Sequence, residues 1–132
     1  MSIMSWNVAG LERHGANINS HVFGTDLLCL QETWTSFTIP IQGFYAYSSP
    51  AKKTNLFGRN SGGLATYVNF NVNIGVKAIA DTPDNMQAFI LDKVFAQQKS
   101  MHCLLINCYF NGSGPEKKRL LQSSMSYLKS LF

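Results

Sequence analysis

The chain has 132 residues, of which 45% are hydrophobic and 14% are charged, and its formal net charge is +4. This length gives one domain with a real core, and so apolar a composition excludes an intrinsically disordered chain. No apolar run approaches the length of a membrane span, and no basic leader precedes the first apolar run. We therefore expect an intracellular protein, in the nucleus or the cytoplasm, without a membrane partner. The weak positive charge is compatible with a polyanionic partner.

The first predicted strand, Ser2–Val8, is an apolar run that ends on a polar side chain. Asn7 stands at its exit, directly before a turn. After a polar loop, a short helix is predicted over Ile18–Phe23, with Asn17 as its amino-terminal cap and Gly24 as its stop.

The stretch Asp26–Trp34, DLLCLQETW, contains the second predicted strand, which ends on a carboxylate. Its four consecutive apolar residues indicate a strand that is buried on both faces. Glu32 follows at the exit, where α/β folds collect ligands, and a hard cation is the expected partner of a carboxylate held there. A glutamate that simply faces water is the alternative. Because the first strand also delivers a polar side chain at its exit, we expect Asn7 and Glu32 to lie side by side.

The second half of the chain is predicted to consist mainly of antiparallel strands. Val72–Ile79 alternates and is expected to form a hairpin with the apolar strand before it, and the next two strands are expected to form another. Pro50–Gly62 is polar and aperiodic, which predicts a surface loop. The predicted strands are Phe44–Ser48, Leu64–Val68, Val72–Ile79, Gln87–Phe95 and Met101–Tyr109.

The last predicted element is a helix. Ser113–Glu116 has the pattern of a capping box, and apolar residues then recur at helical spacing, at Leu121, Met125, Leu128 and Phe132. The pattern stops without a cap, which suggests a truncated chain or an end buried against something. The predicted fold class is α/β, with a mixed, largely antiparallel sheet and helices on one face.

Cysteine and histidine residues give no sign of a metal site. Cys29, Cys103 and Cys108 lie in apolar runs without the spacing of zinc ligands, so buried free thiols are expected. His102 stands between apolar neighbours in a predicted strand, and we expect it to be part of the core.

Four segments resemble motifs of the endonuclease/exonuclease/phosphatase superfamily. SWNVAGL and DLLCLQETW resemble its first two motifs, and SGGLATYV (Ser61–Val68) and LLINCYFNGSG (Leu104–Gly114) follow in the order that the family uses. The sequence is most similar to the apurinic-type endonuclease domains of non-LTR retrotransposons. A branch that acts on phospholipids or inositol phosphates is a less similar alternative. The resemblance implies a DNase I-like four-layer α/β sandwich, of which residues 1–132 would form a single partial domain, the amino-terminal half.

The resemblance also implies a reaction, a cofactor and site residues. The expected reaction is Mg²⁺-dependent cleavage of phosphodiester bonds in DNA, with Mn²⁺ as a substitute. Glu32 matches the metal-binding glutamate, Asn7 the asparagine that assists it at the metal, and Tyr109 the tyrosine that hydrogen-bonds the scissile phosphate. These three are the expected catalytic residues, although a half-buried strand tyrosine is the alternative for Tyr109. Trp34, which a core position would explain equally well, and Asn111 are the expected substrate-binding residues.

The sequence differs from the resembled family at positions that bear on the expected site and activity. CYFNGSG lacks a proline that the family often has, so the correspondence beyond Tyr109 can shift by one residue. Neither the Gly-Asp-Phe-Asn motif nor the Ser-Asp-His motif of its carboxyl-terminal half occurs here. The expected catalytic residues therefore lack a general base, and groups that act as a unit lose most of the rate when one is missing. We expect little or no nuclease activity from the isolated chain.

The alternative function is that of a non-catalytic, domesticated half-domain. Half of a sandwich is expected to leave one sheet face uncovered, and such an apolar face should be buried by a partner. Two copies could cover each other as a homodimer. Binding of nucleic acid without cleavage is a variant of this alternative.

Overall fold

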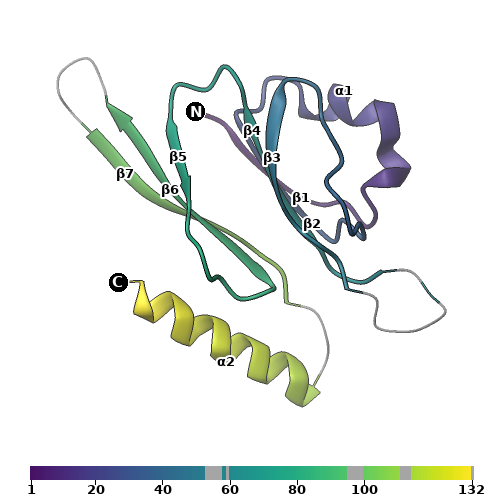
Figure 1. The fold of residues 1–132 in the computed structure, drawn as a ribbon, viewed down its shortest axis with the longest axis vertical. Coiled ribbons are helices and arrows are strands. Elements are labelled where there is room, and N and C mark those ends of the chain that lie inside the picture. Colours follow the sequence, from purple (N-terminus) through teal and green to yellow (C-terminus); the bar gives the residue numbers. More distant parts are fainter. Residues whose placement is uncertain (53–57, 59, 95–99, 111–113, 132) are drawn as a thin grey trace.

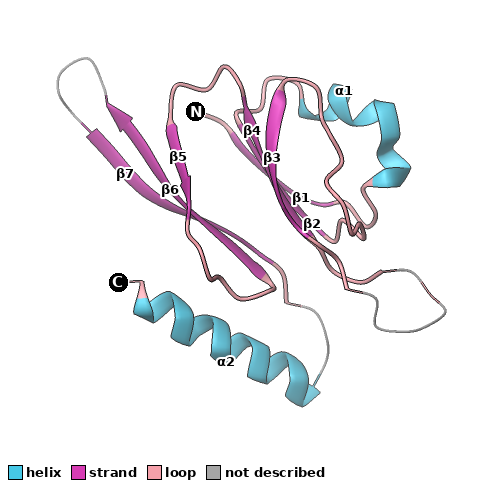
Figure 2. Ribbon diagram, viewed as in Figure 1, coloured by secondary structure: helices cyan, strands magenta, loops and turns pink. Residues whose placement is uncertain are grey.

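The structure is a computed structural model that describes residues 1–52, 58, 60–94, 100–110 and 114–131. The described residues form two β-sheets packed face to face, with helices outside them (Figures 1 and 2). The helical elements are the 3₁₀ helix η1 (Glu12–Asn17), α1 (Ile18–Val22) and α2 (Gly114–Ser130). The strands are β1 (Ile3–Asn7), β2 (Leu27–Gln31), β3 (Phe44–Ser49), β4 (Leu64–Asn69), β5 (Gly75–Ala78), β6 (Met86–Val94) and β7 (Ser100–Cys108).

The four-stranded sheet has the order β1-β2-β4-β3 and is covered on both faces. On one face, Leu28 and Leu30 of β2 pack in a core with residues of α1 and with Leu11, which directly precedes η1. On the other face, Leu27 packs against Phe89 and Leu91 of the second sheet. Both faces of β2 are thus buried, which is why a continuous apolar run is needed here rather than an alternating one.

The three-stranded sheet has the order β5-β6-β7 and is antiparallel throughout. The α/β class predicted from the sequence is confirmed, but the strands divide between two packed sheets instead of forming one mixed sheet. The expected hairpin of Val72–Ile79 with Leu64–Val68 is wrong, because β5 pairs with β6. Alternation along a strand predicts which face is buried and leaves the neighbouring strand undetermined.

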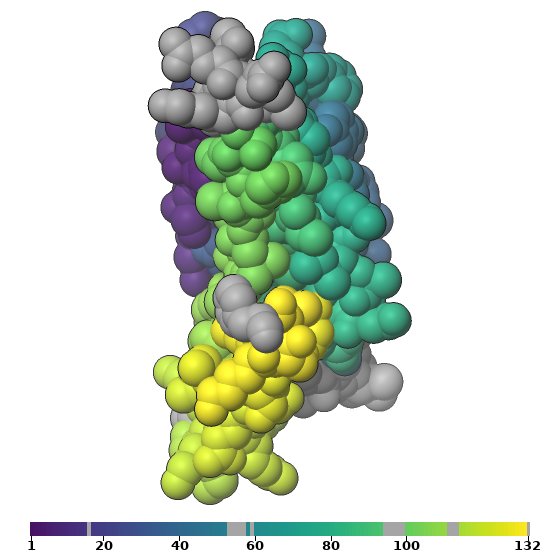
Figure 3. Space-filling model, turned by 90° about the vertical axis from the view of Figure 1, so that its left-hand side faces the viewer, coloured from purple at the N-terminus to yellow at the C-terminus, as the bar shows by residue number. Residues whose placement is uncertain are grey.

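Helix α2 lies across one end of the three-stranded sheet (Figure 3). The expected apolar face is wrong at two of its positions, because the side chains of Leu121 and Met125 are 46% and 48% exposed. The buried side is instead centred on Ser124, whose hydroxyl donates to the Leu120 carbonyl at 2.8 Å and accepts from the Asn85 amide at 3.1 Å. A polar side chain is therefore the buried residue of this helix, and it contacts Asn85, which directly precedes β6.

Local expectations fail where they depended on burial or capping. Asn17 makes no capping hydrogen bond, because the preceding loop is itself the 3₁₀ helix η1. His102 is exposed and pairs with Asp92 at 2.5 Å, on the face of the three-stranded sheet that points away from the other sheet. Cys29 is buried as expected, whereas Cys103, on the edge strand β7, is exposed. In the described part of the chain, no helix has the length and apolar character needed to cross a membrane.

Candidate active site

Two parallel strands deliver Asn7 and Glu32 to the same edge of the four-stranded sheet. Strands β1 and β2 are paired in parallel, with Asn7 opposite Gln31, so Glu32 comes one residue beyond the pair. The chain continues side by side past the strand ends, because the Gly10 amide donates to the Glu32 carbonyl at 2.8 Å. Asn7 is exposed, and its side-chain oxygen accepts from the Ala9 amide at 3.3 Å. The two strand ends therefore lie side by side, as the sequence predicted, and the roles of Asn7 and Glu32 at a metal stay predictions.

The backbone that carries Glu32 is held in an uncommon conformation. Glu32 and Trp34 have φ values of 57° and 59°, in the left-handed region that non-glycine residues seldom adopt. The Trp34 indole N–H donates to Oε2 of Glu32, and the Trp34 amide donates to the Gly62 carbonyl at 3.0 Å. Gly10 leaves space for the indole, since a Cβ there would lie 2.7 Å from its Cε3 atom. Strained residues of this kind persist where the surroundings fix them, and they cluster at functional sites.

Tyr109 reaches the same place from the other sheet. It directly follows β7, and its amide donates to the Asn85 carbonyl at 3.1 Å. Burial raises the pKa of Tyr109, and a hydrogen bond to Glu32 and the negative charge of that residue raise it further. The Tyr109 hydroxyl therefore lies against the Glu32 carboxylate and keeps its proton at neutral pH. One carboxylate is thus held between an indole donor and a phenol donor.

A glycine turn supports the segment that contains Glu32. The Thr33 amide donates to the Gly63 carbonyl at 3.3 Å. Gly63 has a φ of 91°, and a Cβ at this position would collide with Oγ1 of Thr33. Gly63, the second glycine of the SGGL sequence, is therefore required both by the backbone conformation and by the lack of space for a side chain.

A buried amide lies between the two sheets, behind the site. Asn107 of β7 is 1% exposed, and its side-chain oxygen accepts from the Gln31 amide at 2.8 Å. Its amide nitrogen lies 3.2 Å from the carbonyls of Leu30 and Ala65 and 3.2 Å from the hydroxyl of Thr66. Because β7 belongs to one sheet and β2 and β4 to the other, this side chain fixes the sheets relative to each other.

Gln87 of β6 extends this network. Its side-chain oxygen accepts from the Thr66 hydroxyl at 2.8 Å, and its amide donates to the Tyr47 carbonyl at 3.0 Å and to the Ser49 hydroxyl at 3.1 Å. The network therefore connects β6 and β7 with β2, β3 and β4. Since Glu32 and Tyr109 come from different sheets, the same contacts set the distance between them. Neither Asn107 nor Gln87 was expected to have a role from the sequence; the signal available was a polar residue within an apolar strand.

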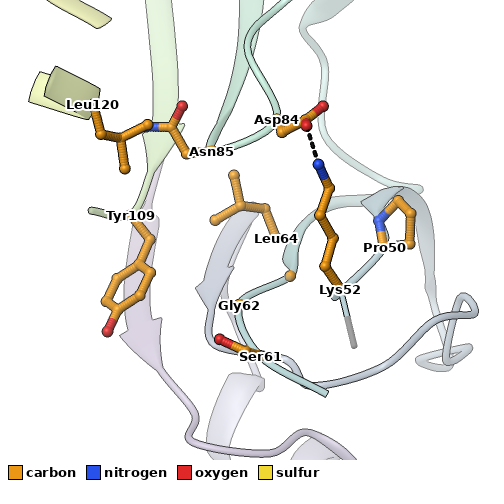
Figure 4. A pocket seen from close by; sticks show the side chains of 10 residues that line it. Pro50, Lys52, Ser61, Gly62, Leu64, Asp84, Asn85, Tyr109 and Leu120 are labelled. Carbon is orange, nitrogen blue, oxygen red and sulfur yellow. Dashed lines mark hydrogen bonds and ion pairs between the residues drawn. The ribbon is translucent and has the colours of Figure 1, made fainter. Parts of the chain in front are cut away.

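Two cavities are lined by residues that neighbour Glu32. One, of about 180 Å³, is lined by Tyr109 (Figure 4), and the other, of about 440 Å³, by Trp34 and Arg13. Tyr109 and Trp34 both hydrogen-bond Glu32, so each cavity has one wall residue in contact with this carboxylate. Asn111, the other expected substrate-binding residue, lies outside the described residues. Within the described ranges, no three His, Cys, Asp or Glu side chains gather into a metal site.

Comparison with known proteins identifies the family. Residues 4–106, most of the chain, match the endonuclease/exonuclease/phosphatase family. The chain belongs to this family. Among solved structures, it is similar to the catalytic domain of Xenopus laevis APE2, with a TM-score of 0.68 and 17% sequence identity, over 99% of this chain and 52% of the APE2 chain. The chain therefore spans about half the length of that structure. A search of curated protein sequences found no match.

The likeness to APE2 confirms the predicted DNase I-like fold. At this identity it shows the fold alone. Together, the family and the fold support a nuclease-type domain.

Proposed function

We propose that this chain is the amino-terminal half of a Mg²⁺-dependent endonuclease that cleaves phosphodiester bonds in DNA, of the type carried by non-LTR retrotransposons. The observation that carries the proposal is the Glu32 carboxylate, held at a strand end between Trp34 and Tyr109 with Asn7 at the neighbouring strand end. The retrotransposon type rests on the sequence motifs.

The residues present fit a hard divalent ion. Mg²⁺ takes oxygen ligands and is usually bound by one or two carboxylates, with water and substrate oxygens completing its shell. Glu32 would supply the carboxylate and Asn7 a neutral amide oxygen. When bound, the ion would neutralise charge on the phosphoryl group.

Tyr109 is suited to hold a phosphate. Its raised pKa keeps the hydroxyl protonated at neutral pH, so it can donate to a non-bridging phosphate oxygen. Trp34 would keep Glu32 oriented through the indole N–H. Two separate cavities, one lined by Tyr109 and one by Trp34, leave room beside the phosphate for more of the substrate than a phosphomonoester has.

The residues assigned to this site, Asn7, Glu32 and Tyr109, do not include a general base. Among the described residues, Glu32 does not belong to any group of three or more His, Cys, Asp or Glu side chains. We propose that the base belongs to a carboxyl-terminal half that these 132 residues do not contain, and that the isolated chain binds metal and phosphate with little turnover.

The test is nicking of supercoiled plasmid with added Mg²⁺, comparing the chain with Glu32→Gln and with the exposed control Glu116→Gln. The expected residual nicking is slow, requires the metal, and disappears only in Glu32→Gln. Equal nicking by all three proteins would assign the activity to a contaminant and would remove the support for a Glu32-dependent nuclease.

A second candidate function is self-association without catalysis. It is favoured by an apolar groove of about 720 Å³ beside the end of α2, lined by Ile90, Leu104 and Leu131, and by the exposed Leu121 and Met125 of the helix. A homodimer that covers this surface would sediment faster as concentration rises. A monomer at every concentration would refute it.

A further inference from the structure

We propose that the cavity of about 180 Å³ beside Tyr109 is a subsite for one nucleobase, adjacent to the phosphate held at Glu32. This inference rests on the proposed function and specifies which part of the substrate the site recognises. The ring of Tyr109 lines the cavity, while its hydroxyl points away from the cavity-lining Leu64 (Figure 4). A phosphate on the hydroxyl would therefore place the adjoining nucleoside next to the cavity.

The size of the cavity selects a small group. Pockets for drug-sized ligands measure roughly 300–1,000 Å³, whereas one water needs about 10–15 Å³. A volume of about 180 Å³ lies between these limits and suits one ring system. Leu64 from β4, Leu120 from α2 and the ring of Tyr109 provide apolar walls from three separate elements.

The charges of the cavity do not favour a second phosphate. Lys52 is the cation in its lining, and its ammonium is paired with the carboxylate of Asp84, which also lines the cavity (Figure 4). An anion would meet that carboxylate and would have to compete for the ammonium. A neutral ring can stack between the apolar walls and turn its polar edge toward the ion pair and the Ser61 hydroxyl.

The cavity is rigidly connected to the metal-binding side of the site. Gly62 and Gly63 line it. Their carbonyls accept hydrogen bonds from the amides of Trp34 and Thr33, the two residues that directly follow Glu32. A base in this cavity and a phosphate at Glu32 would therefore be held at a fixed separation. Such an arrangement favours nucleotides over other phosphate esters, since a base stacked on an aromatic ring adds affinity for any base.

The experiment compares two ligands that share a phosphate. Thymidine 5′-monophosphate and 2-deoxyribose 5-phosphate are titrated separately into the chain with Mg²⁺, and binding is followed by NMR shifts of Tyr109. The nucleotide is expected to bind roughly 5- to 150-fold more tightly, the range for stacking of one base. Equal affinities for the two ligands would refute the nucleobase subsite. This result needs no variant, because it is measured on the unaltered protein.

Variants locate the preference within the molecule. Leu120→Trp should fill the cavity and bring the two affinities together, whereas Leu121→Trp, on the exposed side of the same helix, should leave the preference intact. A folded Leu120→Trp protein that still prefers the nucleotide would refute the location. Glu32→Gln should lower the affinity for both ligands by the same factor. If deoxyribose phosphate binding did not depend on Glu32, the proposed function would fail independently of the base preference.

Discussion

Replacement of Asn107 by leucine should be costly, because this side chain connects the two sheets. Its amide has two hydrogens, which are shared among four acceptors at 3.2–3.4 Å, and its oxygen accepts one bond at 2.8 Å. The substitution thus removes the equivalent of three buried hydrogen bonds, at about 0.5–1.5 kcal/mol net for each. The expected loss is about 1.5–4.5 kcal/mol, a large part of a total stability on the order of 5–15 kcal/mol.

Urea unfolding followed by circular dichroism measures this loss. The midpoint of Asn107→Leu should fall without a change in the denaturant slope, because the surface exposed on unfolding is unchanged. Asn19→Leu makes the same chemical change at an exposed position of α1 and should stay within about 0.5 kcal/mol of the unaltered protein. A loss below about 1 kcal/mol for Asn107→Leu would refute the role of this amide in joining the sheets.

Three further predictions concern the turn, the thiols and a buried phenol. Gly63→Ala should cost at least about 1 kcal/mol in the same unfolding assay, since it adds backbone strain and a collision with Thr33. An aromatic disulfide reagent should modify the exposed Cys103 rapidly and Cys29 only on unfolding, because burial raises the pKa of the Cys29 thiol to about 11. Burial raises the pKa of Tyr67 from 10.0 to about 12. The contribution of this phenol to the free energy of unfolding is therefore full below pH 10 and is lost as the pH rises toward 12. Tyr67→Phe should remove that part of the pH dependence of stability.

The fold was predictable where the sequence pattern has a local cause. The apolar run of β2 follows from burial on both of its faces, and the hairpin of β6 and β7 follows from two adjacent strands with a short connection. The division into two sheets could not be predicted, because the alternation of Val72–Ile79 is satisfied by either neighbouring strand. The same limit applies to α2, where the apolar spacing pointed to Leu121 and Met125 although the buried residue is Ser124.

The candidate site was predictable only in part. Strand ends placed Asn7 and Glu32 at one edge of the sheet, since parallel neighbours end together. The contact between Trp34 and Glu32 depends on two left-handed backbone conformations at non-glycine residues, which local preferences do not predict. The contribution of Asn107 required knowledge of which strands face each other across the two sheets.

Binding of Mn²⁺ is the measurement that bears most directly on the proposed site. In calorimetric titrations with Mn²⁺ as a probe for Mg²⁺, the unaltered chain should bind one ion, with paramagnetic broadening of NMR signals concentrated at Trp34 and Tyr109. Glu32→Gln should weaken binding at least about tenfold, on the order of 1.4 kcal/mol, whereas the exposed Glu116→Gln should leave it unchanged. Equal affinity in the three proteins, or broadening that avoids Trp34 and Tyr109, would contradict a metal site at the end of β2.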